Sequence, residues 1–275
     1  MFISVSIITV ITSIPLFFYP ESPRFRLVKG NDTEAKKILK KLSQIFDNPI
    51  SFEEIELVYT THKHNYLDQL RDFLRYPAML KTTLSLMLSW FVAGTLFYGL
   101  QFGWHKIGKD IYTSMIFSSV GGMLGEVMSY GSNVLIGRKK AMIMFFGGAT
   151  LSFLAAIPEV ELSGGWQLQN VACLLAMVFI FGAFGTSYLL TSELSPTSHR
   201  GMVLSFCSSS ARVGAFLGPY ISLLYDVWDR RVVLGLFAVA AFCACGDMML
   251  VGDSTGTCIP DTPAEMNKKG NSTED

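Results

Sequence analysis

The sequence has 275 residues, of which 50% are hydrophobic, and its formal net charge is zero. Charged residues make up 16%, which is sparse for a soluble chain of this length, and the neutral balance gives no reason to expect a nucleic-acid partner. The apolar residues fall into long blocks instead of the short periodic runs of a soluble domain. The composition therefore predicts an all-α membrane protein.

Seven apolar blocks approach or reach the length of about 20 residues that a bilayer-crossing helix needs. They are residues 2–19, 79–102, 111–136, 141–157, 168–191, 202–225 and 232–251. The predicted domains are a transmembrane helix at 1–19, a cytoplasmic loop with short helices at 20–77, a six-helix transmembrane bundle at 78–251 and a disordered cytoplasmic tail at 252–275.

The only substantial polar segment, residues 20–77, contains a basic helical pattern. Residues 31–34, Asn-Asp-Thr-Glu, supply helix-capping chemistry, and Ile38, Leu39, Leu42 and Ile45 then recur at helical spacing with lysines on the other face. A basic helix of this kind can bind lipid or a calmodulin-type protein, but a charge run this short favours a solvated face.

Lysine and arginine residues predict the orientation in the membrane. The first loop holds most of them, and Arg138, Lys139 and Lys140 form a second basic turn. If the spans alternate, these segments share one side with residues 192–201 and with the tail. The positive-inside rule makes that side cytoplasmic.

No arrangement of residues indicates catalysis. The five cysteines lack zinc-ligand spacing, and Cys243 and Cys245 are too close together for a CxxC redox pair. The four histidines lie in loops or at the ends of spans, without a partner set that the topology would gather. We therefore expect neither an enzyme nor a metal or cofactor.

Two charged residues lie inside apolar blocks. An arginine at bilayer depth costs at least about 2.5–3.5 kcal/mol on insertion scales, so such residues mark functional sites or internal pairs. Glu126 is either a satisfied buried carboxyl or a substrate contact. Arg212 is either a partner for Glu126 or Asp247, or a substrate contact. The substrate-facing role is favoured for Glu126 and Arg212, and a structural role for Asp247.

Three aromatic residues, Trp90, Tyr98 and Tyr130, are candidates for lining a cavity. An aromatic face attracts an organic cation by about 0.5–2 kcal/mol. Each of them taken alone is more typical of packing or of the interfacial aromatic belt.

Four motifs together resemble one transporter family. They are PESPR at 20–24 after a spanning block, WFV and YGL at 90–100, GEV through GRK at 125–139, and ELSPTxxRG with SxARVG at 193–214. The chain is similar to the organic cation, organic anion and carnitine transporters of the major facilitator superfamily. The resemblance covers nearly the whole chain.

The resemblance implies a multi-pass plasma-membrane protein that moves small organic ions by alternating access. It assigns Arg138, Glu193 and Arg200 to a cytoplasmic gate motif, whereas Val134 and Leu135 replace the usual Asp-Arg pair of that motif. It maps this chain onto helices six to twelve only. We therefore expect a truncated form or fragment, for which the missing N-terminal half is a candidate partner, or a protein that lost transport.

The resemblance also suggests a substrate class. Cation-selective members of the family tend to carry an acid where this chain has Arg212, and carnitine- and anion-type members tend to carry arginine. Glu126 together with Arg212 therefore implies a zwitterionic or carboxylate-bearing substrate. The alternative is a non-transporting membrane protein, either a truncated partner or regulator, or a seven-helix receptor. The long segment after the first span argues against a receptor.

Overall fold

The computed structural model describes residues 10–13, 32–45, 66–107, 111–158, 161–162, 166–196 and 199–251. These residues fall into two units, residues 1–65 and 66–275. The first unit contains helical residues 10–13 and helix α3 (Asp32–Ile45). The predicted first span and the predicted tail therefore lie almost entirely outside the described residues.

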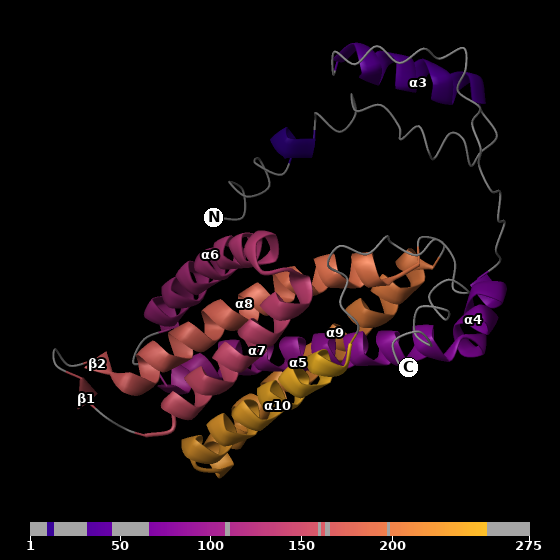
Figure 1. Ribbon diagram of the computed structural model, residues 1–275. Coiled ribbons are helices and arrows are strands. Elements are labelled where there is room, and N and C mark those ends of the chain that lie inside the picture. Colours follow the sequence, from indigo (N-terminus) through magenta and orange to yellow (C-terminus); the bar gives the residue numbers. More distant parts are fainter. Residues whose placement is uncertain are drawn as a thin grey trace. The chain divides into compact units, whose positions relative to one another are not determined.

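The second unit is built almost entirely of helices (Figure 1). They are α4 (Tyr66–Arg75), α5 (Pro77–Ile107), α6 (Ile111–Leu135), α7 (Arg138–Ala155), α8 (Leu168–Leu194), α9 (Arg200–Val227) and α10 (Arg230–Leu250). Two strands, β1 (Glu161–Leu162) and β2 (Trp166–Gln167), pair antiparallel between α7 and α8. Helices α5 to α10 confirm the six predicted apolar blocks between residues 79 and 251 to within a few residues, except that α5 continues to Ile107.

Local chemistry explains where several helices begin. Pro77 is the first residue of α5, a position where the missing amide hydrogen costs nothing. Gly137 separates α6 from α7 with φ at 86°, a backbone conformation that favours glycine. At α10, the Asp229 side chain accepts a hydrogen bond from the Arg231 amide and caps the helix.

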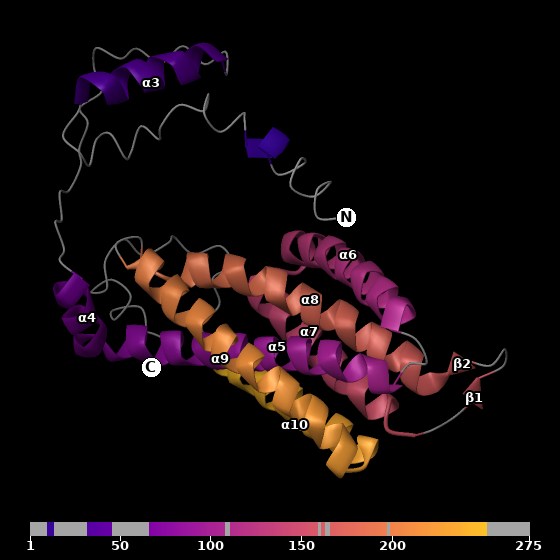
Figure 2. The same cartoon turned by 180° about the vertical axis from the view of Figure 1, so that it is seen from behind.

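Helices α5 and α8 form the centre of this unit. Helix α9 packs along α5, α6 packs along α8, and α7 lies between α8 and α10. Seen from behind, α9 crosses in front of α5 while α6 lies apart from it beside α8 (Figure 2). Helices α6 and α9 therefore flank the α5–α8 pair from its two sides.

Glycines allow the flanking helices to approach the central pair. A Cβ atom placed on Gly94 of α5 would lie 2.5 Å from the carbonyl oxygen of Ala211 on α9. One placed on Gly125 of α6 would lie 2.5 Å from the carbonyl oxygen of Val178 on α8. Small residues at such contacts are typical of helices packed in a membrane.

Large aromatic side chains fill the interior, and Trp90, Phe145, Phe146 and Phe153 are fully buried. Three of the described helices, α5, α8 and α10, are long and apolar enough to cross a membrane. Helices α6 and α9 are also long, but they carry Glu126 and Arg212 among glycines and serines. The almost entirely helical class is confirmed, whereas the count of seven spans stays a prediction.

Candidate functional site

Glu126 lies on α6 where this helix meets α8. Its side chain is exposed, and a Cβ atom placed on Gly185 of α8 would lie 2.8 Å from Glu126 Oε2. The same Cβ atom would lie 3.1 Å from Ser129 Oγ, one helical turn further along α6. The bare backbone of Gly185 therefore leaves the space that the Glu126 carboxylate occupies.

A buried polar network continues from Ser129 along the same contact between α6 and α8. Ser129 Oγ lies 3.0 Å from Thr186 Oγ1, and Asn133 Nδ2 donates to Ser129 Oγ at 3.2 Å and to Thr186 Oγ1 at 3.1 Å. Burying polar groups is unfavourable unless they are hydrogen-bonded, and each of these hydroxyls has partners here. The network joins α6 to α8 through hydrogen bonds between Ser129 and Asn133 of α6 and Thr186 of α8.

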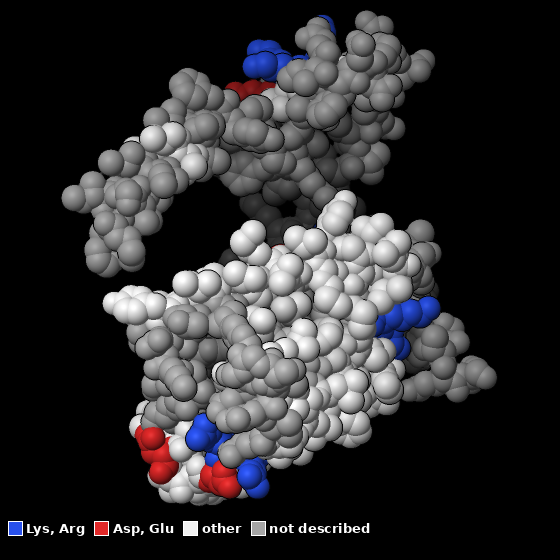
Figure 3. Space-filling view, turned by 90° about the vertical axis from the view of Figure 1, so that its left-hand side faces the viewer, with Lys and Arg blue, Asp and Glu red and all other residues white. Residues whose placement is uncertain are grey.

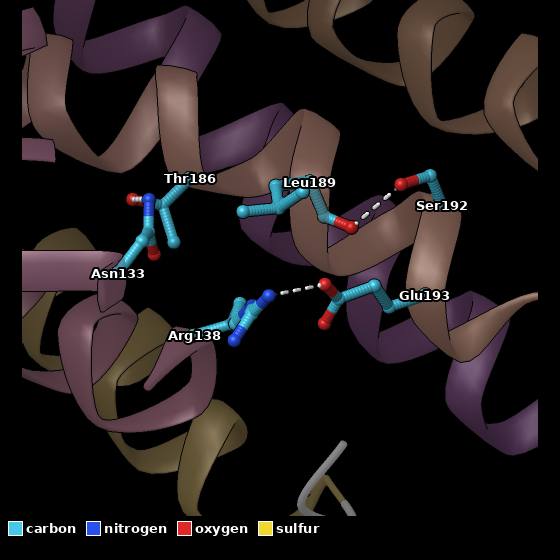
Figure 4. A network of polar contacts seen from close by, with 6 residues as sticks. All are labelled: Asn133, Arg138, Thr186, Leu189, Ser192 and Glu193. Carbon is cyan, nitrogen blue, oxygen red and sulfur yellow. Dashed lines mark hydrogen bonds and ion pairs between the residues drawn. The ribbon is translucent and has the colours of Figure 1, made fainter. Parts of the chain in front are cut away.

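The ion pair of Arg138 and Glu193 lies beyond this network. Arg138 Nη2 and Glu193 Oε1 are 2.9 Å apart, which joins the start of α7 to the end of α8 (Figure 4). The two side chains are only 34% and 18% exposed, so water screens the pair less than a surface pair. The structure thus brings together two of the three residues of the predicted gate motif.

The other positions of the predicted gate motif are placed as follows. Arg200 is the first residue of α9 and is half-buried, and its role in a charge cluster stays a prediction. Val134 and Leu135 are exposed near the end of α6. The apolar pair that replaces the usual Asp-Arg therefore adds no charge to this corner of the bundle.

Arg212 lies on α9 with its side chain exposed, and its Nη1 donates to Ser208 Oγ at 2.5 Å. One turn of helix separates these two residues, so the bond orients the guanidinium along its own helix. Asp247 of α10 instead accepts a hydrogen bond from Ser85 of α5 at 2.9 Å. Within the described part of the chain, Arg212 is ion-paired with neither Glu126 nor Asp247.

The aromatic candidates are placed differently from one another. Tyr98 on α5 is 38% exposed, and Tyr130, one turn after Glu126 on α6, is 77% exposed. Trp90 is 1% exposed, and its indole Nε1 donates to Thr191 Oγ1 at 3.0 Å. Trp90 is therefore a packing residue in this structure, because no surface is left for a ligand to touch.

An aromatic cluster of six side chains joins α5 to α8. The Trp90 ring meets Tyr188 with centroids 4.4 Å apart, and Phe97 meets Phe181 at 4.9 Å. The members of the cluster, with ring centroids no more than 6.3 Å apart, are Trp90, Phe97, Tyr98, Phe181, Phe184 and Tyr188. Sequence reasoning missed the α8 members, although their spacing of three and four residues is a helical-face signal.

The arrangement places opposite charges on the two flanking helices, with aromatic rings on the two central helices. Glu126 lies on α6, which packs on α8, and Arg212 lies on α9, which packs on α5. Tyr98 and Tyr188 are the members of the cluster with exposed side chains. A carboxylate, a guanidinium and aromatic faces are the groups that bind the two ends of an organic ion.

Comparison with known proteins gives an independent line of evidence. The sequence pattern of the Major Facilitator Superfamily matches residues 1–219. Solute carrier family 22 member 3 of Rattus norvegicus is 27% identical over 270 residues, covering 94% of this chain and 48% of the relative.

Two human relatives give a similar result. Organic cation/carnitine transporter 2 is 28% identical over 264 residues, covering 91% of this chain and 45% of the relative. Solute carrier family 22 member 2 is 27% identical over 266 residues, covering 92% and 47%. The chain spans about half the length of the curated relatives it matches.

Proposed function

We propose that this chain, which belongs to the Major Facilitator Superfamily, carries part of a pathway by which organic ions cross the membrane. The observation that carries the proposal is the pair of exposed, opposite charges on α6 and α9. Neither Glu126 nor Arg212 is neutralised by an ion pair within the described residues, although each lies in a long helix of a membrane protein. Charges at membrane depth mark substrate or ion pathways.

The substrate class follows from the chemistry of the two charges. A guanidinium binds a carboxylate through two parallel hydrogen bonds. A carboxylate beside aromatic faces suits a quaternary ammonium group. Glu126, with Tyr130 one helical turn away on α6, and Arg212 on α9 therefore favour a zwitterion such as carnitine over a plain cation. The names of the relatives, which include an organic cation/carnitine transporter, are compatible with this class.

Alternating access provides the mechanism of the proposal. Two halves of a transporter rock about a site near the bilayer midplane, and contacts at one face break and reform in each cycle. The pair of Arg138 and Glu193 ties α7 to α8 at one end of the bundle. If the α6–α7 turn and the α8–α9 loop face the cytoplasm, this pair belongs to the inner gate, with Arg200 nearby in the chain.

The test is uptake of labelled carnitine into cells that make this chain alone, or together with the N-terminal half of the Rattus norvegicus relative. We expect uptake in at least one of these arrangements, and loss of that uptake with Arg212→Ala. Uptake that is unchanged by Arg212→Ala and Glu126→Gln in the same cells would contradict the proposed site.

A non-transporting partner of a complete transporter is the second candidate, because the chain matches only about half of each relative. In that case the chain alone would show no uptake. It would instead change the uptake by the complete relative when both are made in the same cell.

A further inference from the structure

We propose that the four lysines of α3, Lys36, Lys37, Lys40 and Lys41, form a lysine face that binds anionic lipid headgroups. The leaflet concerned is the one on the side that the basic loops predict to be cytoplasmic. This interaction is separate from the proposed transport pathway and would hold whether or not the chain transports.

The lysine face is the outward side of an amphipathic helix. All four lysine side chains are exposed, and spacings of four residues place Lys36 above Lys40 and Lys37 above Lys41. On the opposite side Ala35 is fully buried, and Ile38 and Leu39 are half-buried. Among the side chains that the structure describes, the lysine side of α3 is therefore more exposed than its apolar side. In Figure 3, blue basic side chains lie next to red acidic ones on the part of the molecule that carries α3.

Helix α3 carries four lysines and only two acidic residues, Asp32 and Glu34, so its positive charges are in excess. Like charges four residues apart destabilise a helix, and a solvated helix typically alternates the sign of its charges. Within the described residues, none of the four ammonium groups is ion-paired with a carboxylate. An anionic surface supplies the missing counter-charge. The excess of positive charge on this helix favours a partner of opposite sign.

The neighbouring sequence extends the positive segment. Arg24, Arg26 and Lys29 precede α3, so seven basic residues occur between positions 24 and 41. Clusters of about four to eight Lys and Arg residues next to a spanning helix or on an amphipathic helix are typical of binding to phosphatidylserine and phosphoinositides. The attraction extends over a Debye length of about 8 Å at physiological salt.

A lipid surface fits this helix better than an acidic protein of the calmodulin type. Calmodulin-type targets insert the apolar face of a helix into a groove. On the apolar face of α3, Ala35 is 0% exposed, and Ile38 and Leu39 are half-buried. A headgroup layer needs only the lysine face, which is available without unfolding anything.

The experiment is hydrogen exchange of the full chain in lipid nanodiscs, followed by mass spectrometry of the α3 segment. The discs contain phosphatidylcholine alone or phosphatidylcholine with phosphatidylserine. One variant changes all four lysines to Gln, and a matched control changes all four to Arg. Gln, Arg and Lys have similar helix propensities, so exchange in phosphatidylcholine shows whether each variant keeps the helix.

We expect phosphatidylserine to slow exchange of α3 by about tenfold or more in the wild-type chain and in the Arg variant. The Gln variant should not respond, and about 1 M salt should abolish the effect because it shortens the Debye length to about 3 Å. A second control, Lys139→Gln with Lys140→Gln, should leave the response of α3 unchanged.

Three results would overturn the proposal. The first is equal exchange of wild-type α3 with and without phosphatidylserine. The second is a response in the Gln variant as large as that in the Arg variant. The third is protection by calcium-loaded calmodulin in phosphatidylcholine discs with none from phosphatidylserine, which would assign the face to a protein partner.

Discussion

Arg138 Nη2 and Glu193 Oε1 lie 2.9 Å apart and connect the first residue of α7 to the last turn of α8. The two residues are far apart in the sequence, and both belong to turns that the positive-inside rule assigns to one side of the membrane. The contact therefore fixes the relative positions of two helices at one end of the bundle. It is also the contact whose removal is easiest to test.

Arg138→Ala should lower the stability of the bundle by about 1–3 kcal/mol, because a half-buried carboxylate loses its charged hydrogen-bond partner. The measurement is the melting temperature of the purified chain in detergent. Lys140→Ala, at an exposed position in the same turn, is the matched control and should change little. The exchanged pair Arg138→Glu with Glu193→Arg should recover part of the loss. If the exchanged pair recovered none of the lost stability, the ion pair itself would not contribute to the stability of the bundle.

Trp90→Phe should destabilise the bundle by about 1–3 kcal/mol, because it leaves a gap in the core and removes the hydrogen bond to Thr191. Thr191→Val should cost less when added to Trp90→Phe than in the wild-type chain, since the bond between these two side chains is then already absent. Trp228→Phe is the control, because Trp228 is 49% exposed. If Trp90→Phe altered substrate preference while the melting temperature stayed constant, the result would indicate that Trp90 contacts substrate and is not a packing residue.

Gly125→Ala should destabilise the chain, because its Cβ atom would lie 2.5 Å from the carbonyl oxygen of Val178. Overpacking of this kind typically costs about 1–3 kcal/mol. Gly131→Ala on the same helix has nothing within 4 Å of its Cβ and should stabilise α6 by up to about 1 kcal/mol through helix propensity. The two melting temperatures should therefore move in opposite directions. Equal shifts would mean that α6 and α8 do not approach each other at Gly125.

Arg212→Ala should weaken recognition of a carboxylate-bearing substrate more than tenfold while largely sparing plain cations. Glu126→Gln should do the reverse. Losing one partner of a buried charged contact typically costs about 2–5 kcal/mol. Because about 1.4 kcal/mol corresponds to a tenfold change in affinity, the loss of affinity should exceed tenfold. The measurement is competition by the two substrate types for labelled carnitine uptake.

The control for these two variants is Ser208→Ala. It removes the hydrogen bond that orients Arg212 but keeps the charge, so its effect should be smaller. Equal losses with every substrate after Arg212→Ala and Glu126→Gln would indicate a structural role for both residues, and the zwitterion proposal would fall.

The positions of the helices, the membrane class and the family follow from the sequence by itself. Long apolar blocks determine where helices form, because each backbone polar group in a bilayer must be satisfied within its own helix. Gly137 and Pro77 end or begin helices through their own backbone geometry. Glu126 and Arg212 stand out because a charge in an apolar block is costly wherever it points.

Only the tertiary structure decided which side chains meet. A helix that is apolar all round gives no periodic signal for the face it buries, so the sequence could not separate buried Trp90 from exposed Tyr98 on α5. The network of Ser129, Asn133 and Thr186 depends on the register of α6 against α8, which the close approach at Gly125 permits. Contacts between distant segments are set by packing, and packing is a property of the assembled helices.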